Sequence, residues 1–285
     1  MKSVRICFAA ITAGMVCIAV MLGILSAAIY AENESGDSFI GLMYHQVLKD
    51  ESRAGKYIIT PNELESDLAY LSENGYVSVL PSQLVKIREQ GGRLPEKTVV
   101  ITFDDGYETG LYYVLPLLKK YGMKAVINVV GSYTDEYSRI NEEGKHLSYA
   151  YLTWNEIKTL SDSGYVEIGN HTYDMHSNNG DRNGCARKEN ESDEQYRKVL
   201  YEDVARLSDK LQQVTGKRPV AFAYPFGSLS DGSAEIIGSA GISVFMTCCE
   251  QPCSMNRNGR IVINRYNRES GRTAQQICEE FNNAF

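Results

Sequence analysis

The chain has 285 residues, enough for one large α/β domain or two small ones, and its formal net charge is −7. Residues 1–31 hold two bases and no acids, so the remaining chain carries −9. Because like charges repel, a chain this acidic is a poor match for nucleic acid or any other anionic polymer. Composition therefore argues against a nucleic-acid partner and favours a neutral or cationic one.

The N-terminus has the pattern of a targeting segment. Lys2 and Arg5 precede an uncharged stretch from Ile6 to Tyr30. As a helix this stretch would be about 37 Å long, enough to cross a membrane, whereas the apolar part of a secretory signal is normally shorter. We predict that residues 1–31 are a long signal peptide or, by a slight preference, an uncleaved membrane anchor. The positive end would stay inside, so the rest of the chain would be exported.

Residues 32–38 read as a polar linker, and residues 39–285 as one domain without an internal boundary. Apolar stretches predict strands at 39–44, 76–80, 99–103, 124–130, 165–169, 219–223, 242–246 and 259–264. Amphipathic stretches with capping signals predict helices at 60–74, 81–89, 111–121, 153–163, 194–215, 234–240 and 274–281. Residues 131–149 and 180–194 are polar and predicted as loops. Strand and helix alternate, which indicates an α/β fold with mainly parallel strands, and the seven or eight repeats suggest a barrel.

Cysteine usage leaves the redox state open. The part predicted to be exported holds an odd number of cysteines: Cys185, Cys248, Cys249, Cys253 and Cys278. An oxidising compartment permits disulfides, but the pairing cannot be deduced from sequence. The group at 248–253 lacks the second pair that a zinc finger requires. A loop with one disulfide and a set of free thiols both remain open.

The most informative stretch of the chain is Val99–Gly106, with sequence VVITFDDG. Its apolar part, with three β-branched residues, is typical of a strand buried on both faces of a parallel sheet. Asp104 and Asp105 follow where that strand ends, and parallel strands carry their chemistry at this end. Two adjacent carboxylates usually need a metal ion or one shared proton. The alternative is a plain turn after the strand.

A second polar group, His171 and His176, directly follows another predicted strand. Their spacing would put them about 140° apart on a helix, so a loop has to bring them together. The alternative is two loop histidines without a shared partner. With Asp105 they offer two neutral imidazoles and one carboxylate, for which Zn²⁺ is the default and Fe, Co or Ni are alternatives. Such a metal lowers the pKa of bound water to about 7, and Asp104 could then act as general base.

These motifs, in this order, resemble the polysaccharide deacetylases, carbohydrate esterase family 4. The resemblance covers about residues 39–285 and rests on four segments: Leu42–His45, Thr102–Asp105, His171–His176 and Ala221–Gly227. It implies a distorted (β/α) barrel with seven strands. It also implies Asp104 as the base and Asp105 with both histidines as metal ligands. The five-residue spacing of the histidines is similar to the subgroup that acts on poly-N-acetylglucosamine of biofilms.

The resemblance also gives roles to the segment after the strand at 219–223. Tyr224, Pro225 and Phe226 would line the substrate groove, and the backbone N–H of Phe226 would help to hold the oxyanion. The family's usual arginine at the start of this motif is Ala223 here, and we suggest Arg265 as its replacement.

The family's final Leu-x-x-His motif, which supplies the general acid, is absent, and no histidine follows His176. His45 follows the first predicted strand and could face the site, although a structural role is an equal alternative. Asp104 could also return the proton that it takes from water.

From the sequence we therefore expect an exported, membrane-attached, metal-dependent hydrolase that removes N-acetyl groups from a glycan. Poly-N-acetylglucosamine, peptidoglycan and chitin-like oligomers are the candidate substrates. Two alternatives stay open: an O-acetyl esterase on xylan-type glycans, and a glycan-binding module whose site has decayed.

Overall fold

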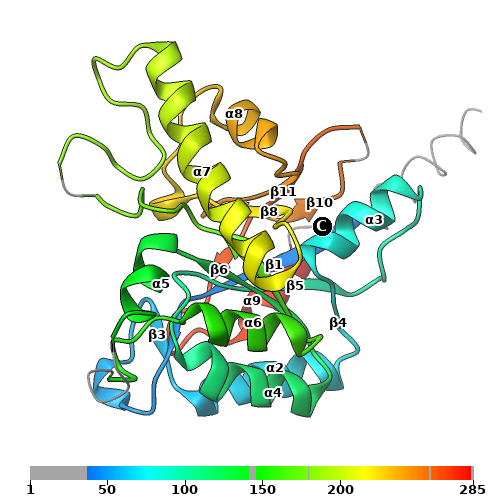
Figure 1. Ribbon diagram of the computed structural model, residues 1–285. Helices are drawn as coiled ribbons and strands as arrows, with labels where there is room; N and C mark the ends of the chain where they lie inside the picture. The colour runs from blue at the N-terminus through cyan, green and yellow to red at the C-terminus, as the bar shows by residue number, and fades with distance from the viewer. Residues whose placement is uncertain (1–36, 141–145, 179, 257, 284–285) are drawn as a thin grey trace, which may run out of the picture.

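The computed structural model describes residues 37–283 apart from 141–145, 179 and 257 (Figure 1). The predicted leader, residues 1–31, lies outside the described residues, as does most of the predicted linker. Within the described part of the chain, no helix combines the length and the apolar character that a membrane span requires.

Seven parallel strands form the framework, in the spatial order β1-β5-β6-β7-β8-β9-β11. They are β1 (Ser38–Tyr44), β5 (Thr98–Phe103), β6 (Ala125–Val129), β7 (Val166–Asn170), β8 (Ala221–Ala223), β9 (Val244–Met246) and β11 (Ile261–Ile263). Short strands add to this sheet: β4 (Val77–Ser78) pairs with β5, while β10 (Cys253–Ser254) and β12 (Tyr266–Asn267) pair with β1. Strands β2 (Gln46–Val47) and β3 (Ile58–Ile59) form a separate pair.

The sheet rolls into a nearly closed barrel. Its two ends meet where β1 passes the residues that follow β11: a Cβ built on Gly41 would lie 2.3 Å from the carbonyl oxygen of Asn264. Only glycine permits so close a backbone approach. The predicted α/β barrel is confirmed, with the seven parallel strands that the family resemblance implied.

Helices surround this barrel. They are α2 (Pro61–Glu73), α3 (Pro81–Glu89), α4 (Leu115–Tyr121), α5 (Gly131–Tyr137), α6 (Trp154–Asp162), α7 (Asp193–Thr215), α8 (Ser233–Ser239) and α9 (Ala274–Asn282), with single turns at η1 (Glu51–Arg53), η2 (Gly110–Val114) and η4 (Pro225–Gly227). Helices α2, α4, α6 and α9 lie together on one side, while α7 and α8 lie on another (Figure 1). A capping box begins α2, because Thr60 and Glu63 each accept a hydrogen bond from the other's backbone N–H.

Side chains alternate along each strand between the surrounding helices and the barrel interior, as the pleat of a strand requires. In β5, Val99, Ile101 and Phe103 pack outward against the helices, whereas Val100 belongs to the inner cluster. In β6 the same alternation puts Val126 inside. Continuing this alternation past the end of each strand determines which polar side chains enter the barrel.

The structure corrects one predicted loop. Residues 131–149 were expected to form a polar loop, but Gly131–Tyr137 is helix α5. This segment has no apolar periodicity. Its first two N–H groups are instead satisfied from outside, by the carbonyl oxygens of Thr172 and Tyr173. A tertiary contact therefore supports this helix, and local sequence could not reveal it.

The open question about cysteines is answered for the described residues, in which all five are free thiols: Cys185, Cys248, Cys249, Cys253 and Cys278. The predicted strands at 76–80, 219–223 and 259–264 are each shorter than expected.

Candidate metal centre

Three side chains from two strand ends converge on one point. Asp105 lies in the turn after β5, and His171 and His176 lie in the loop after β7. Asp105 Oδ1 is 3.4 Å from His171 Nε2 and 3.0 Å from His176 Nε2. One ligand atom from each residue lies within 4.8 Å of the others, so a single cation can contact all three. The structure thus brings together the three residues that the sequence suggested as ligands.

The surroundings of the two imidazoles fit a metal ion. His171 Nδ1 lies 2.8 Å from the carbonyl oxygen of Ala223, which can only accept a hydrogen bond. This contact puts the proton on Nδ1 and leaves a lone pair on Nε2, the atom that faces Asp105. His176 Nδ1 is 3.3 Å from the hydroxyl of Tyr133, which belongs to α5. Each imidazole therefore has an outer partner and an inner nitrogen for a ligand.

Electrostatics at the three residues favour a cation. Burial on its own would raise the pKa of Asp105, but the two histidine side chains hold it well below its usual range. Burial would likewise lower the pKa of His171, yet the neighbouring carboxylates raise it. The charged form of the Asp105 carboxylate is thus stabilised in a buried site. A divalent cation at the same point would stabilise that charge further.

Asp104 faces the barrel interior, in step with Val100 and Thr102, and is 2% exposed. Its Oδ1 accepts hydrogen bonds from Arg265 Nη1 at 2.8 Å and from Asn128 Nδ2 at 2.7 Å. Burial would raise the pKa of Asp104, but the charges of Arg265 and His171 lower it to about 2. Asp104 is therefore held as an oriented carboxylate beside the three candidate metal ligands.

Arg265, which we suggested as the replacement for the missing arginine, contacts Asp104 from the segment after β11. Its guanidinium is fully buried and also donates to Thr102 Oγ1 and to the carbonyl oxygen of Thr247. Arg265 follows β11 in the inward register of Ile261 and Ile263, so the far end of the chain supplies the positive partner of Asp104.

The turns that carry these groups are strained. Among the described residues, three non-glycine residues have a positive φ: Asp105 at 73°, Thr172 at 73° and Phe226 at 58°. They lie in the segments after β5, β7 and β8, which carry the three candidate ligands and the predicted groove residues. A non-glycine residue in the left-handed region costs about 1–3 kcal/mol, and such residues cluster at functional sites.

A pocket of about 480 Å³ opens above these groups. Its lining includes the predicted residues His45, Asp104, Asp105, His171, His176, Tyr224 and Phe226. Phe226 is 48% exposed, and its ring centroid lies 4.7 Å from that of His176. Pro225 was expected to line the groove, but it is buried in the turn η4 and does not line the pocket.

His45, the predicted auxiliary residue, also lines this pocket. Its Nδ1 is buried and has no hydrogen-bond partner among the described residues. Burial lowers its pKa, against the opposing effect of the two aspartates. An unpaired buried nitrogen beside a pocket indicates a group that interacts with what the pocket holds.

Sequence reasoning missed Asn128, Tyr133 and Tyr107. Asn128 carries no motif, and only the observed pairing of Thr102 with Val126 places it next to Asp104 in the inward register. Tyr133 could not be found either, because α5 was taken for a loop. Tyr107 lines the pocket just after the Asp-Asp pair, but tyrosine is too common in this chain to stand out.

Comparison with known families agrees with this geometry. The polysaccharide deacetylase family model matches residues 91–245, and the chain therefore belongs to that family. A poly-beta-1,6-N-acetyl-D-glucosamine N-deacetylase of Escherichia coli K12 is 27% identical over 231 residues, 74% of this chain but only 34% of that protein. The protein of the same name from Staphylococcus aureus MRSA252 is 23% identical over 80% of this chain and 77% of its own length.

Solved structures show the same fold. A de-N-acetylase from Aggregatibacter actinomycetemcomitans superimposes with a TM-score of 0.73 at 26% identity, covering 85% of this chain and 99% of that one. IcaB from Ammonifex degensii gives a TM-score of 0.68 at 26% identity, covering 86% and 97%.

Proposed function

We propose that this protein is a metal-dependent N-deacetylase of an N-acetylglucosamine polysaccharide, of the poly-N-acetylglucosamine type. The observation that carries the proposal is the convergence of Asp105, His171 and His176 beside the buried carboxylate of Asp104. The names of the similar proteins support the same substrate class. Zn²⁺ is the cation that two imidazoles and one carboxylate favour, with Co²⁺, Ni²⁺ or Fe²⁺ as alternatives.

When bound, a divalent cation polarises a carbonyl oxygen and makes water easier to deprotonate. The chain's own residues supply the rest. Asp104 takes the proton from the attacking water, and since Arg265 and Asn128 both bind Oδ1, we assign this role to Oδ2. Keeping Oδ1 occupied fixes the orientation of the carboxylate, which is what a general base needs.

Two further residues act on the substrate in this proposal. The backbone N–H of Phe226 donates to the oxygen that becomes negative when water attacks the acetamide carbonyl, an effect worth about 2.7–4 kcal/mol for one such donor. Asp104 then returns the proton that it took from water, and the unpaired Nδ1 of His45, which lines the same pocket, accepts this proton and passes it to the nitrogen of the leaving amine. Acetate leaves, and a glucosamine unit with a free amine remains.

Export completes the proposal. The uncharged stretch Ile6–Tyr30 after Lys2 and Arg5 would carry the domain across the membrane, where it would stay attached or be released. The substrate would then be a polysaccharide outside the cell.

The test is acetate release from N-acetylglucosamine oligomers by the full-length protein in detergent, after chelation and after addition of Zn²⁺. Release that needs the metal and falls about 10²–10⁴-fold in Asp104→Asn supports the proposal. The variant should still bind metal, because Asp104 is not among the three ligands.

Three other outcomes would overturn the proposal. Release from acetylated xylan but not from the oligomers would indicate an O-acetyl esterase. Glycan binding without release, with metal bound, would indicate a binding module. Failure to bind any metal would remove the site assignment.

A further inference from the structure

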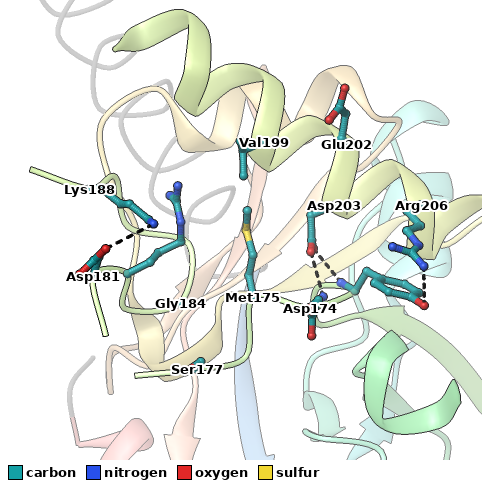
Figure 2. Close-up of a pocket in the computed structure, with 12 residues that line it drawn as sticks. Asp174, Met175, Ser177, Asp181, Gly184, Lys188, Val199, Glu202, Asp203 and Arg206 are labelled. Atoms are coloured by element: carbon teal, nitrogen blue, oxygen red, sulfur yellow. Dashed lines mark hydrogen bonds and ion pairs between the residues drawn. The ribbon is translucent and has the colours of Figure 1, made fainter. Parts of the chain in front are cut away.

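The loop that joins His171 to His176 is held by helix α7. Asp203, in the middle of that helix, accepts two successive backbone N–H groups of the loop. Its Oδ1 lies 2.7 Å from Tyr173 N, and its Oδ2 lies 2.8 Å from Asp174 N (Figure 2). Both carboxylate oxygens of Asp203 thus accept hydrogen bonds from the backbone between the two proposed ligands.

A second contact with α7 lies one residue before His171. Asn170 is fully buried, and its Nδ2 donates to the carbonyl oxygen of Val204 at 2.9 Å and to Ser208 Oγ at 3.0 Å. Its Oδ1 accepts the N–H of Thr172 at 2.9 Å. Thr172 is one of the strained residues, so Asn170 ties its unusual backbone conformation to the helix.

A third contact uses the side chain of Tyr173. The guanidinium of Arg206, one turn after Asp203 on α7, lies 3.6 Å from the centre of the Tyr173 ring, and its Nη2 donates to the Tyr173 hydroxyl. That hydroxyl also bonds Asp135 of α5. The same face of α7 therefore contacts the loop at three successive points.

Packing of the loop against α7 is only partial. Met175 is buried in one cluster with Leu200 of that helix, but a pocket of about 610 Å³ also lies between the loop and α7 (Figure 2). Its walls include Met175, Ser177 and Gly184 on the loop side and Val199 and Glu202 on the helix side. The hydrogen bonds at Asp203 are thus formed at the edge of an open space, just before the second histidine.

We propose that Asp203 is a positioning residue that sets the separation of His171 and His176, and through it the metal affinity of the site. The inference rests on the proposed function. Asp203 fixes the backbone of two of the four residues between the histidines, and Asn170 and Ser208 fix a third. Without these contacts, Thr172 would be free to leave its strained conformation, and the two imidazoles would no longer meet at Asp105.

Asp203→Asn tests the inference, because the amide keeps the size of the side chain but turns one acceptor into a donor facing an N–H. We expect the affinity of the apoprotein for Zn²⁺, measured by competition with a chelator, to fall about tenfold or more. The visible spectrum of bound Co²⁺ should change, and kcat should fall while KM stays within about twofold. Asp209→Asn is the matched control, since Asp209 is an exposed residue of the same helix that pairs with Arg218.

A folded Asp203→Asn variant with the metal affinity and Co²⁺ spectrum of the parent would overturn the inference. If this variant does not fold, Asp203→Glu decides, because it keeps the charge but moves the carboxylate oxygens away from the N–H groups of Tyr173 and Asp174. An affinity about two- to tenfold lower supports the inference, as weakening of these hydrogen bonds predicts, and an unchanged affinity overturns it. A parent protein that binds neither Zn²⁺ nor Co²⁺ would instead overturn the metal centre, and the inference with it.

Discussion

Arg265 Nη1 lies 2.8 Å from Asp104 Oδ1, although 161 residues separate them in the sequence. Both side chains are almost completely buried. Neither charge could remain in the barrel interior alone, because taking a single ion out of water costs several kcal/mol. The pair therefore links the stability of the barrel to the orientation of the proposed base.

Removing one member of this pair should be costly. We expect Arg265→Met to lower the free energy of unfolding by about 3–5 kcal/mol, because it leaves Asp104 buried without its counter-charge. Urea titration followed by circular dichroism measures this. Arg272→Met is the control: Arg272 is partly exposed and pairs with Glu250 and Glu280, so its loss should cost about 1 kcal/mol or less. Equal stability of the two variants would contradict the buried-pair argument.

The inner wall of the barrel should not tolerate a methyl group at Gly169. A Cβ there would lie 2.0 Å from Asn128 Oδ1 and would displace the amide that binds Asp104. We expect Gly169→Ala to lose about 1–3 kcal/mol of stability through overpacking, and to lose deacetylation with it. Gly55→Ala is the matched control, because nothing lies within 4 Å of a Cβ at that position. A Gly169→Ala variant with the activity of the parent would show that Asn128 does not orient the base.

The hydroxyl of Tyr133 should matter for metal binding. It lies 3.3 Å from His176 Nδ1 and 3.1 Å from the carbonyl oxygen of the same residue. We expect Tyr133→Phe to lower metal affinity by about 10-fold, the usual cost of losing an outer partner of a ligand. Tyr137→Phe on the same helix removes a hydroxyl that bonds Tyr149 instead, so its affinity should match the parent. Chelator competition on the apoproteins compares the two, and equal affinities would count against the role of Tyr133.

Asp135 should make stability depend on pH in acid. Burial would raise its pKa, but hydrogen bonds from Lys210, Tyr173 and Trp154 lower it to about 2. A carboxyl whose pKa is depressed on folding stabilises the protein above its unfolded pKa of about 4 and loses this contribution as pH falls toward 2.

Asp135→Asn should therefore be about 1 kcal/mol less stable than the parent near pH 6, a value reduced for partial contact with water. The difference should narrow steadily below pH 4. Thermal unfolding between pH 2.5 and 6.5 measures it, with Asp162→Asn, an exposed partner of Lys158, as control. A difference that stays constant over this range would contradict the assigned shift.

The parts of the site that depend on neighbouring residues could be predicted from the sequence. Asp104 and Asp105 were evident because two carboxylates follow an unbroken apolar strand, and His171 and His176 because they follow another. The barrel was predictable from the alternation of strands with capped helices and from the motif order. The roles of these two aspartates and two histidines in catalysis and metal binding stay predictions, although the structure brings the four side chains together.

The remaining features depend on distant parts of the chain. Helix α5 has no amphipathic pattern and begins where the loop of His171 offers acceptors for its N–H groups. Asn128 carries no motif and becomes significant only when the register of β5 against β6 is known. The hydrogen bond between Asp203 and the backbone of Tyr173 connects helix α7 to a loop about 30 residues earlier. Residue spacing alone cannot reveal this contact.

The position of Arg265 has a consequence for how the protein is made. A ribosome completes the strands that carry Asp104, His171 and His176 well before it reaches residue 265. Until then the proposed base lacks its counter-charge, and β1 lacks its pairing with β12. The nascent barrel can therefore bring its proposed metal ligands together before it can hold the proposed base in its final orientation. Catalytic competence would thus arrive late in synthesis, once the final strands have joined the first.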